Sequence, residues 1–302
     1  MQHLVTAGYL ARFADRMGRV TVVSRASPSQ RRTVRVSEAA TFRDFYTLQN
    51  REGDDRYALE RALADVEGDG LEAVRQLCER DEPLSTAQRA SICRLVAFQR
   101  VRGQRVRRAG EAFSNVIEKL MPGAWLDHDG QLVEGLRRND AGEVEPDPEE
   151  HLGVMVRSAR DIERVLIRYH LRLLRFDTPE LLTSDEPVQC TRYPGWSTLE
   201  GVGPANADEV WFPLDPRSML VLSPHATCGN WLTKANQRQA TVNINQVVAT
   251  AAYAEIYFTP GRNPLQTFDL SPPGPLVQVG APHAFDVDGI NSPPTRRRPR
   301  RR

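Results

Sequence analysis

Lysine is almost missing from this chain of 302 residues, because Lys119 and Lys234 are the only lysines among its 40 basic residues. Two explanations fit the excess of arginine: a genome rich in G and C, or recognition of phosphate by the planar guanidinium fork. Long apolar runs are also absent, since none approaches the roughly 18 residues that cross a bilayer. The opening residues lack the basic segment and apolar core of a signal peptide. We therefore expect a cytoplasmic protein without a membrane span.

Cysteine is scarce as well, and its four copies at positions 78, 93, 190 and 228 are widely spaced. None belongs to a CxxC pair, which excludes the common pattern of a structural zinc site. The chain also lacks the GxxxxGKS/T phosphate loop, the GxGxxG and HExxH motifs and the GxSxG elbow. A catalytic or binding site must therefore be sought among polar residues that are scattered along the chain.

The pattern of apolar residues predicts an α+β fold. Residues 19–24 and 32–36 alternate and are rich in β-branched side chains, so we expect a hairpin over 19–36 with a longer loop. Residues 55–175 form a largely helical region, in which apolar residues recur at helical spacing. Within it, Gly68 and Gly70 are expected to divide one helix from the next.

Three further segments complete the expected fold. Ser85 and Gln88 have the spacing of a capping box, which predicts a helix that runs to about residue 108. Residues 127–150 are polar and rich in turn formers, which predicts a surface loop, and a long helix is expected over 151–175. From 180 to 260, short apolar runs predict strands, with one late helix that leads into a strand. We expect the N-terminal hairpin and the C-terminal strands to form a sheet against the helical middle region.

The charge distribution separates the end of the chain from the rest. One domain is predicted over residues 1–260, followed by a proline-rich segment and an arginine-rich tail over 261–302. Six arginines lie within the last eight residues: Arg296, Arg297, Arg298, Arg300, Arg301 and Arg302. Removing these six from the 40 basic residues leaves 34 against 39 acidic residues. Such a tail would attract nucleic acid through counterion release or an anionic membrane surface, or would only raise solubility.

A second basic cluster lies at the end of the helix that begins at Ser85. Arg105, Arg107 and Arg108 belong to it and are candidate contacts to nucleic acid. The alternative is that arginine favours a helix C-terminus, where the helix dipole is negative. Gln99 and Arg102 precede this cluster on one helix face, a spacing that suits a clamp for phosphate or carboxylate.

Three acidic residues and one histidine interrupt apolar segments. Glu60 and Glu67 are seven residues apart and point the same way from a helix. They could bind a divalent cation or act as acid and base, or they could lie on a solvated face with local ion pairs. Asp185 follows a predicted strand, where metal ligands, catalytic carboxylates and turn formers all occur. His3 precedes an apolar segment and is either a ligand or a hydrogen-bonded structural histidine.

The order of these motifs resembles an uncharacterised, mainly bacterial family, the domain of unknown function DUF 4238. QHLVTAGYLARFAD, at residues 2–15, is similar to its opening phrase, Gln-His-Tyr-Val-Pro followed by Tyr-Leu and Phe. The further matches are Phe45-Tyr46, Glu60 and Glu67, Gln99 with Arg102, Ser184-Asp185 with Pro187-Val188, Phe212-Pro213-Leu214 with Pro216, and Asn245 ahead of Ala252.

The similarity covers roughly residues 2–260. Leu4, Thr6 and Glu186 depart from it, because the family usually has Tyr, Pro and Asn at these positions, and the arginine tail lies outside it. The resemblance implies no established activity. It does imply that six polar positions are shared within the family and form one common site: His3, Glu60, Glu67, Gln99, Arg102 and Asp185.

Two hypotheses for function follow. The first is a metal-dependent phosphodiester hydrolase of the nuclease type, in the setting of a bacterial toxin or a phage-defence effector. Three carboxylates would hold Mg²⁺ or Mn²⁺: Glu60, Glu67 and Asp185. His3 would act as base or additional ligand, and Arg102, held by Gln99, would neutralise the charge that develops on phosphate.

The second hypothesis is a non-catalytic binding module. In it the same six polar residues form a buried network that specifies the fold without catalysing a reaction. The arginine tail would then recruit nucleic acid or a protein partner. Neither hypothesis predicts an oligomeric state.

Overall fold

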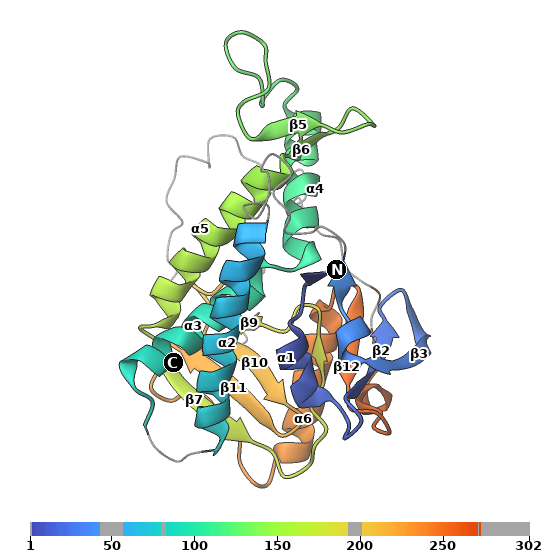
Figure 1. The fold of residues 1–302 in the computed structure, drawn as a ribbon, viewed down its shortest axis with the longest axis vertical. Coiled ribbons are helices and arrows are strands. Elements are labelled where there is room, and N and C mark those ends of the chain that lie inside the picture. Colours follow the sequence, from blue (N-terminus) through green and yellow to red (C-terminus); the bar gives the residue numbers. More distant parts are fainter. Residues whose placement is uncertain (1, 43–56, 80–82, 193–200, 271, 273–302) are drawn as a thin grey trace, which may run out of the picture.

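The computed structural model describes residues 2–42, 57–79, 83–192, 201–270 and 272, and its ribbon is drawn in Figure 1. Two four-stranded antiparallel sheets lie within it. The strand order of the first sheet is β3 (Ser27–Arg35), β2 (Arg19–Ser24), β12 (Glu255–Phe258) and β8 (Thr183–Ser184). The N-terminal hairpin thus shares a sheet with C-terminal strands, and the predicted α+β fold with its helical middle is confirmed.

The hairpin turn is tighter than predicted. β2 ends at Ser24 and β3 begins at Ser27, so the expected loop residues 27–30 belong to the second strand. β3 lies at the edge of its sheet and is mostly exposed. An edge strand tolerates Pro28 because its outer backbone groups need no neighbouring strand. The polar residues of this exposed strand give it the composition of a loop, which is why a loop was predicted here.

The two central strands of the second sheet, β10 (Glu209–Asp215) and β11 (Ser218–Ser223), are buried on both faces. The strand order of this sheet is β7 (His170–Arg175), β11, β10 and β9 (Gln189–Thr191). On β11, Leu220 and Leu222 belong to one hydrophobic cluster with Ile92, whereas Met219 and Val221 belong to another with residues of the late helix. Neighbours on a strand point to opposite faces, so the four residues between Ser218 and Ser223 are all apolar because both faces are covered.

Helices cover the two faces of this sheet. Those on the side of Ile92 are α2 (Ala58–Glu79), α3 (Thr86–Val101) and α5 (Pro148–Leu166), and α6 (Gln237–Ala251) lies on the other side. α2 is one continuous helix, so the prediction that glycines divide it was wrong. A Cβ at position 70 would collide with Leu95 of α3. Gly70 therefore serves the close packing of two helices rather than a turn.

α3 confirms one local prediction and corrects another. Ser85 and Gln88 form the capping box in both directions. The helix, however, ends at Val101, and a new helix α4 (Gln104–Leu120) starts after Gly103. The cluster Arg105, Arg107 and Arg108 therefore lies in the first turns of α4 and not at a helix C-terminus.

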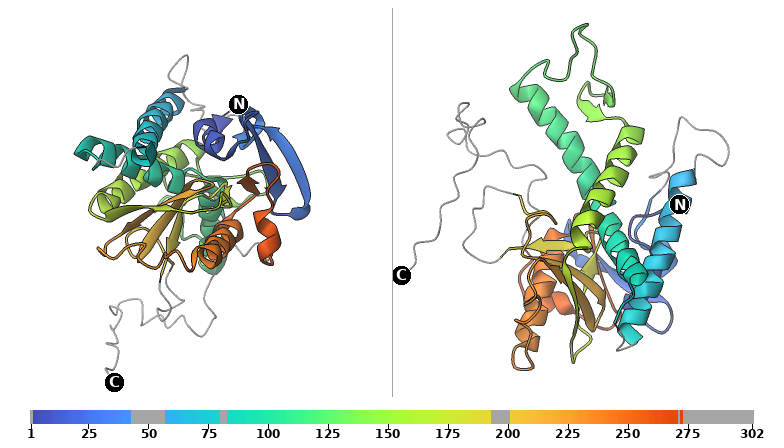
Figure 2. Two further views of the ribbon diagram at one scale, coloured as in Figure 1. Left: turned by 90° about the horizontal axis from the view of Figure 1, so that it is seen from below. Right: turned by 90° about the vertical axis from the view of Figure 1, so that its left-hand side faces the viewer.

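α4 and α5 project beyond the sheets as an arm, with a small hairpin at the outer end (Figure 2). This hairpin consists of β5 (Leu136–Arg138) and β6 (Val144–Pro146), and it lies inside the segment predicted as a surface loop. Asn139 closes its turn by accepting the backbone N–H groups of Ala141 and Glu143. The expected long helix over 151–175 is also corrected, because α5 ends at Leu166 and residues from His170 pair with β11.

Two further observations concern the ends of the predicted domain. The late helix and strand are confirmed as α6 and β12. A 3-10 turn at Pro264–Thr267 follows β12, and its Leu265 packs in the same hydrophobic cluster as α6. The predicted domain boundary near residue 260 stays a prediction. Within the described ranges, no helix combines the length and apolarity that a bilayer crossing requires.

Candidate functional site

His3 is held in place by a two-stranded sheet near the start of the chain. β1 (Gln2–His3) pairs with β4 (Thr41–Phe42), so that His3 lies opposite Thr41. The next backbone N–H, that of Leu4, donates to Ala40 at 3.0 Å. Thr6 then caps the short helix α1 (Ala7–Leu10) by accepting the N–H of Tyr9. The imidazole is thus fixed at the point where the chain leaves a strand and enters a helix.

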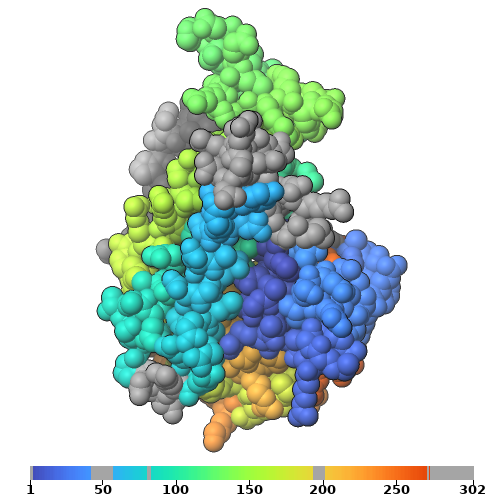
Figure 3. All heavy atoms as spheres, viewed as in Figure 1, coloured from blue at the N-terminus to red at the C-terminus, as the bar shows by residue number. Residues whose placement is uncertain are grey.

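A pocket of about 220 Å³ lies between this N-terminal segment and α2. We call it the His3 pocket, and its polar side chains are those of His3, Thr6, Glu60, Glu67 and Arg102. Figure 3 shows α2 running beside the N-terminal segment on this face of the molecule. Two helical turns separate Glu60 from Glu67 and bring both to the pocket, as their spacing predicts. Four of the six candidate residues therefore meet in one pocket.

Arg102 joins three elements at the base of this pocket. Its Nη1 is paired with Glu67 Oε1 of α2, and its Nη2 donates to the backbone oxygen of His3 at 2.6 Å. The Arg102 side chain is 4% exposed and that of Glu67 is 21% exposed. A buried guanidinium needs such partners because removing its charge from water is costly. Arg102 is positioned by the C-terminal end of α3, where its own N–H still bonds to Phe98.

The His3 imidazole is biased towards its neutral form. Burial lowers the pKa of His3 below 6.5, and the nearby carboxylate of Glu67 only partly opposes this effect. The ring also hydrogen-bonds the backbone of Ser37. Its buried Nε2 has no hydrogen-bond partner within the described residues, so the Ser37 contact is made by Nδ1. A neutral imidazole with an unshared Nε2 is suited to accept a proton.

Asp185 and Gln99 are not among the residues that line the His3 pocket. Asp185 accepts the backbone N–H groups of Tyr253 and Ala254, at 2.9 and 2.6 Å, and so holds the connection from α6 to β12. Burial raises the pKa of Asp185 to about 6, although these N–H groups lower it. Gln99 is buried one turn before Arg102, and in the described part of the chain neither polar atom of its side chain has a partner.

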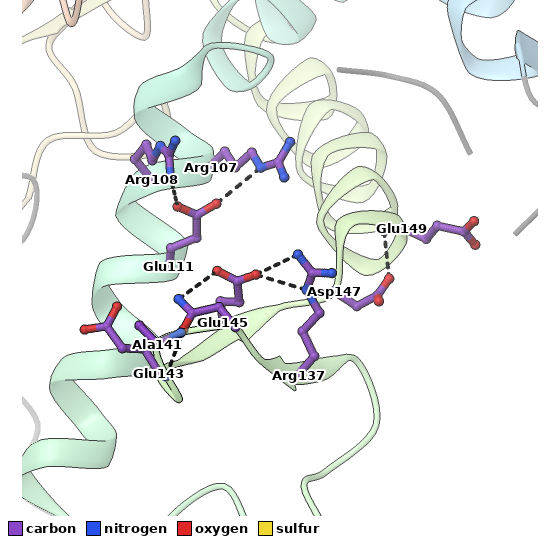
Figure 4. A network of polar contacts seen from close by, with 10 residues as sticks. Arg107, Arg108, Glu111, Arg137, Ala141, Glu143, Glu145, Asp147 and Glu149 are labelled. Carbon is purple, nitrogen blue, oxygen red and sulfur yellow. Dashed lines mark hydrogen bonds and ion pairs between the residues drawn. The ribbon is translucent and has the colours of Figure 1, made fainter. Parts of the chain in front are cut away.

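The basic cluster of α4 is engaged in contacts within the chain. Arg105 donates to the carbonyl of Ala251 at the C-terminus of α6, a favourable place for a cation. Arg107 and Arg108 both pair with Glu111 (Figure 4). Nearby on the arm, Glu145 of β6 pairs with Arg137 of β5 in the same view. The tail arginines 296–302 lie outside the described residues, as does the Phe45-Tyr46 pair.

A different group of metal-ligand atoms occurs on the arm. Asp127, His128 and Asp129 place one ligand atom each within 4.8 Å of the others, and it is the one such group found in the described residues. All three are exposed, and Asp127 Oδ1 accepts the backbone N–H groups of Asp129 and Gln131. This arrangement is that of an Asx-type turn, which explains the proximity of the acids without a metal.

Glu186 is a buried ionisable residue that the sequence analysis singled out only as a departure from the family's Asn. It is 3% exposed and lies against Gly103, where α4 begins. Burial raises the pKa of Glu186 to about 8, with a further contribution from Asp185, while Arg100 and Arg105 lower it. The local sequence, in which Glu186 stands between Asp185 and Pro187, does not by itself predict a raised pKa. The raised pKa follows only from the burial of the side chain in the folded protein.

Comparisons with known proteins identify a family without an assigned activity. The family model described as a protein of unknown function (DUF4238) matches residues 1–262, and the chain therefore belongs to this family. No curated protein matches the chain. No solved structure matches it either.

Proposed function

We propose that this member of the DUF4238 family is a phosphodiester hydrolase whose reaction takes place at the His3 pocket. One observation carries the proposal: an imidazole with an unshared Nε2 lines the same pocket as two carboxylates and an arginine. A general base, acidic groups and a cation are the parts that hydrolysis of a phosphodiester needs. The pocket has about 220 Å³, below the roughly 300 Å³ of typical ligand pockets, so it suits one phosphate group rather than a whole nucleotide.

Each residue has a role that follows from its contacts. His3 supplies the proton-accepting nitrogen, and the Ser37 contact keeps the ring in the required tautomer. Because Nε2 is buried, the attacking water reaches it only after the surrounding side chains shift. Arg102 supplies positive charge near the phosphate, and Glu67 holds its guanidinium in position. Because these groups are partly or wholly buried, their charges act in a medium of lower dielectric than water.

Glu60 and Glu67 fit a hard divalent cation better than a transition metal with sulphur ligands. Their carboxylates provide oxygen donors, which Mg²⁺ and Mn²⁺ prefer. Mg²⁺ is often held by only one or two carboxylates together with water and substrate phosphate, so Asp185 is not required in the donor set. When bound, such a cation would neutralise part of the phosphate charge.

The test is hydrolysis of bis(para-nitrophenyl) phosphate and of single-stranded DNA with added Mn²⁺. We expect His3→Asn and Glu60→Gln to lower the rate at least about 100-fold, the usual contribution of a general base or its equivalent. Glu79→Gln is the matched control, because Glu79 lies on the same helix in an exposed pair with Arg75. Equal rates in the wild type, the two pocket variants and the control would refute the assignment.

A second candidate, the non-catalytic module, is favoured by a specific observation. The guanidinium of Arg102 already contacts Glu67 and the His3 backbone, and it is almost fully buried. If this network is structural, Arg102→Met should lower the free energy of unfolding by about 3 kcal/mol, because it leaves a carboxylate without its cation. The module is supported if Arg102→Met is strongly destabilised and the wild type hydrolyses neither substrate. Hydrolysis that depends on His3 contradicts it.

A further inference from the structure

A second pocket, far more aromatic than the first, lies between the second sheet and α6. We call it the tryptophan pocket, and it has about 350 Å³, a size within the usual range for small ligands. Trp211 of β10 and Trp231 of the loop before α6 form one wall, and Ala240 and Ile244 of α6 form another. It shares no lining residue with the His3 pocket.

The two indole rings are locked in orientation by one buried carboxylate. Glu209 is 1% exposed, and its Oε2 accepts the indole N–H of Trp211 at 2.7 Å and that of Trp231 at 2.9 Å. Its Oε1 accepts the backbone N–H of Gly229 at 2.9 Å. The polar end of each tryptophan is thereby used inside the protein. The ring surfaces that line the pocket are available for stacking rather than for hydrogen bonding.

The ring pair is in contact but not parallel. The centroids of Trp211 and Trp231 are 5.6 Å apart, and their planes are inclined by 46°. Both side chains are only partly buried, although they pack against the hydrophobic cluster of α6. Fixed aromatic surfaces that remain partly open to solvent cost little conformational entropy when they bind a flat ligand.

One edge of the pocket offers a hydrogen-bond donor beside an acceptor. Gln239 and Asn243 are one helical turn apart on α6, and Gln239 Nε2 donates to Asn243 Oδ1 at 2.9 Å. This bond does not use the carbonyl oxygen of Gln239, an acceptor, or the two N–H groups of Asn243 Nδ2, which are donors. Exchanging O and N in both amides leaves the same combination of one donor and one acceptor. The edges of nucleobases present the complementary pair, and Asn and Gln read adenine in this way.

The geometry points to a nucleobase-binding site: a flat heterocycle stacks on one of the two indoles and contacts the other at an angle, while its edge bonds to Gln239 and Asn243. Base-on-aromatic stacking is the usual means of holding unpaired bases. Arg192 also lines the pocket, and its guanidinium, whose Nε donates to the backbone oxygen of Asn206, supplies positive charge for a phosphate attached to the base. The site takes either a free nucleotide or an unpaired base of single-stranded nucleic acid. It does not depend on catalysis at the His3 pocket.

Isothermal titration calorimetry of the full chain tests this site with adenosine monophosphate, a short oligodeoxyadenylate and ribose phosphate. We expect the first two to bind and ribose phosphate, which lacks a base, not to bind. Tighter binding of the oligomer identifies single-stranded nucleic acid as the ligand, whereas binding of the monophosphate alone identifies a free nucleotide. Binding of ribose phosphate with an affinity equal to that of adenosine monophosphate would overturn the assignment, because ribose phosphate contains no flat aromatic base.

Variants connect the binding to the pocket. Trp231→Ala should weaken binding by about 5- to 150-fold, since one stacked base contributes about 1–3 kcal/mol. Asn243→Leu should weaken it severalfold, and because Asn243 is exposed this variant keeps its fold. Trp125→Phe is the matched control: its indole lies on the arm and donates to Ser114. Affinity that is unchanged in a folded Asn243→Leu and in Trp231→Ala refutes the site.

Discussion

Replacing Glu186 by glutamine should change how the stability of the protein depends on pH. The Glu186 carboxyl group lies where α3, α4 and the segment after β8 meet. Arg100 Nη1 is 3.9 Å from its Oε2, and the backbone N–H of Arg105 bonds to it. Its Oε1 is buried and has no partner among the described residues. Burial outweighs these favourable contacts and raises the pKa of Glu186 to about 8 from 4.5.

The sign of the effect follows from this raised pKa. Below pH 4.5 the group is protonated in both the folded and the unfolded chain, and its neutral form is fully compatible with burial. As the pH rises towards 8, the unfolded chain releases the proton and the folded protein still holds it, so stability is lost. One pH unit in this range costs about 1.4 kcal/mol. Between pH 6 and 8 the loss is about 2 kcal/mol, after allowing for partial ionisation near pH 8.

Urea denaturation of the wild type and of Glu186→Gln at pH 6, 7 and 8 measures this difference. Glutamine keeps the shape of the side chain but cannot ionise, so the variant should gain about 2 kcal/mol relative to the wild type over this range. Asp185, whose pKa is raised to about 6, also titrates at the lower end of this window, and it is present in both proteins. A difference that stays constant with pH would refute the reasoning. So would a wild type that gains stability relative to Glu186→Gln as the pH rises, which would mean that the carboxylate stabilises the start of α4.

Two backbone and side-chain predictions test the packing around the sites. Gly103→Ala should destabilise the protein by about 1–3 kcal/mol, because the new Cβ would collide with Glu186. Gly68→Ala has open space at its Cβ and should stabilise α2 by about 0.5–1 kcal/mol. Thermal melts compare the two variants, and equal changes in melting temperature would contradict the packing described around Gly103. Tyr9→Phe should cost about 1–2 kcal/mol, since the buried hydroxyl donates to the carbonyl of Pro213 at 2.6 Å. A chemical denaturation curve identical to that of the wild type would contradict this role for Tyr9.

The local elements of the fold were predictable where their signals lie within a few residues. The capping box at Ser85 and the helix that leads into β12 needed only short-range patterns. The break at Gly103 was missed, and the structure explains only why a glycine stands there: a Cβ would collide with the side chain of Glu186, which approaches from a distant part of the chain. The end of α5 was also missed, because residues from His170 have helical spacing but pair with β11.

The candidate sites divide in the same way. The seven-residue spacing of Glu60 and Glu67 predicts that they share one helix face, and both line the His3 pocket. The role of Asp185 depends on backbone N–H groups contributed by Tyr253 and Ala254, which no local pattern reveals. The tryptophan pocket was not anticipated, because Trp211 and Trp231 carry no motif and become a pair only through Glu209.

The α+β class, the paired glutamates on one helix face and the family to which the chain belongs can be read from the amino-acid order alone, because they depend on short-range periodicity and on motif order. Which polar residues share a pocket, and which serve as internal supports, is known only from the folded arrangement. Burial and hydrogen bonding depend on neighbours from remote segments, and no local pattern contains them. The pKa of Glu186 is raised because the folded chain buries its carboxyl group. The carboxylate of Glu209 orients two indole rings because the fold brings Trp211 and Trp231 within hydrogen-bonding distance of it.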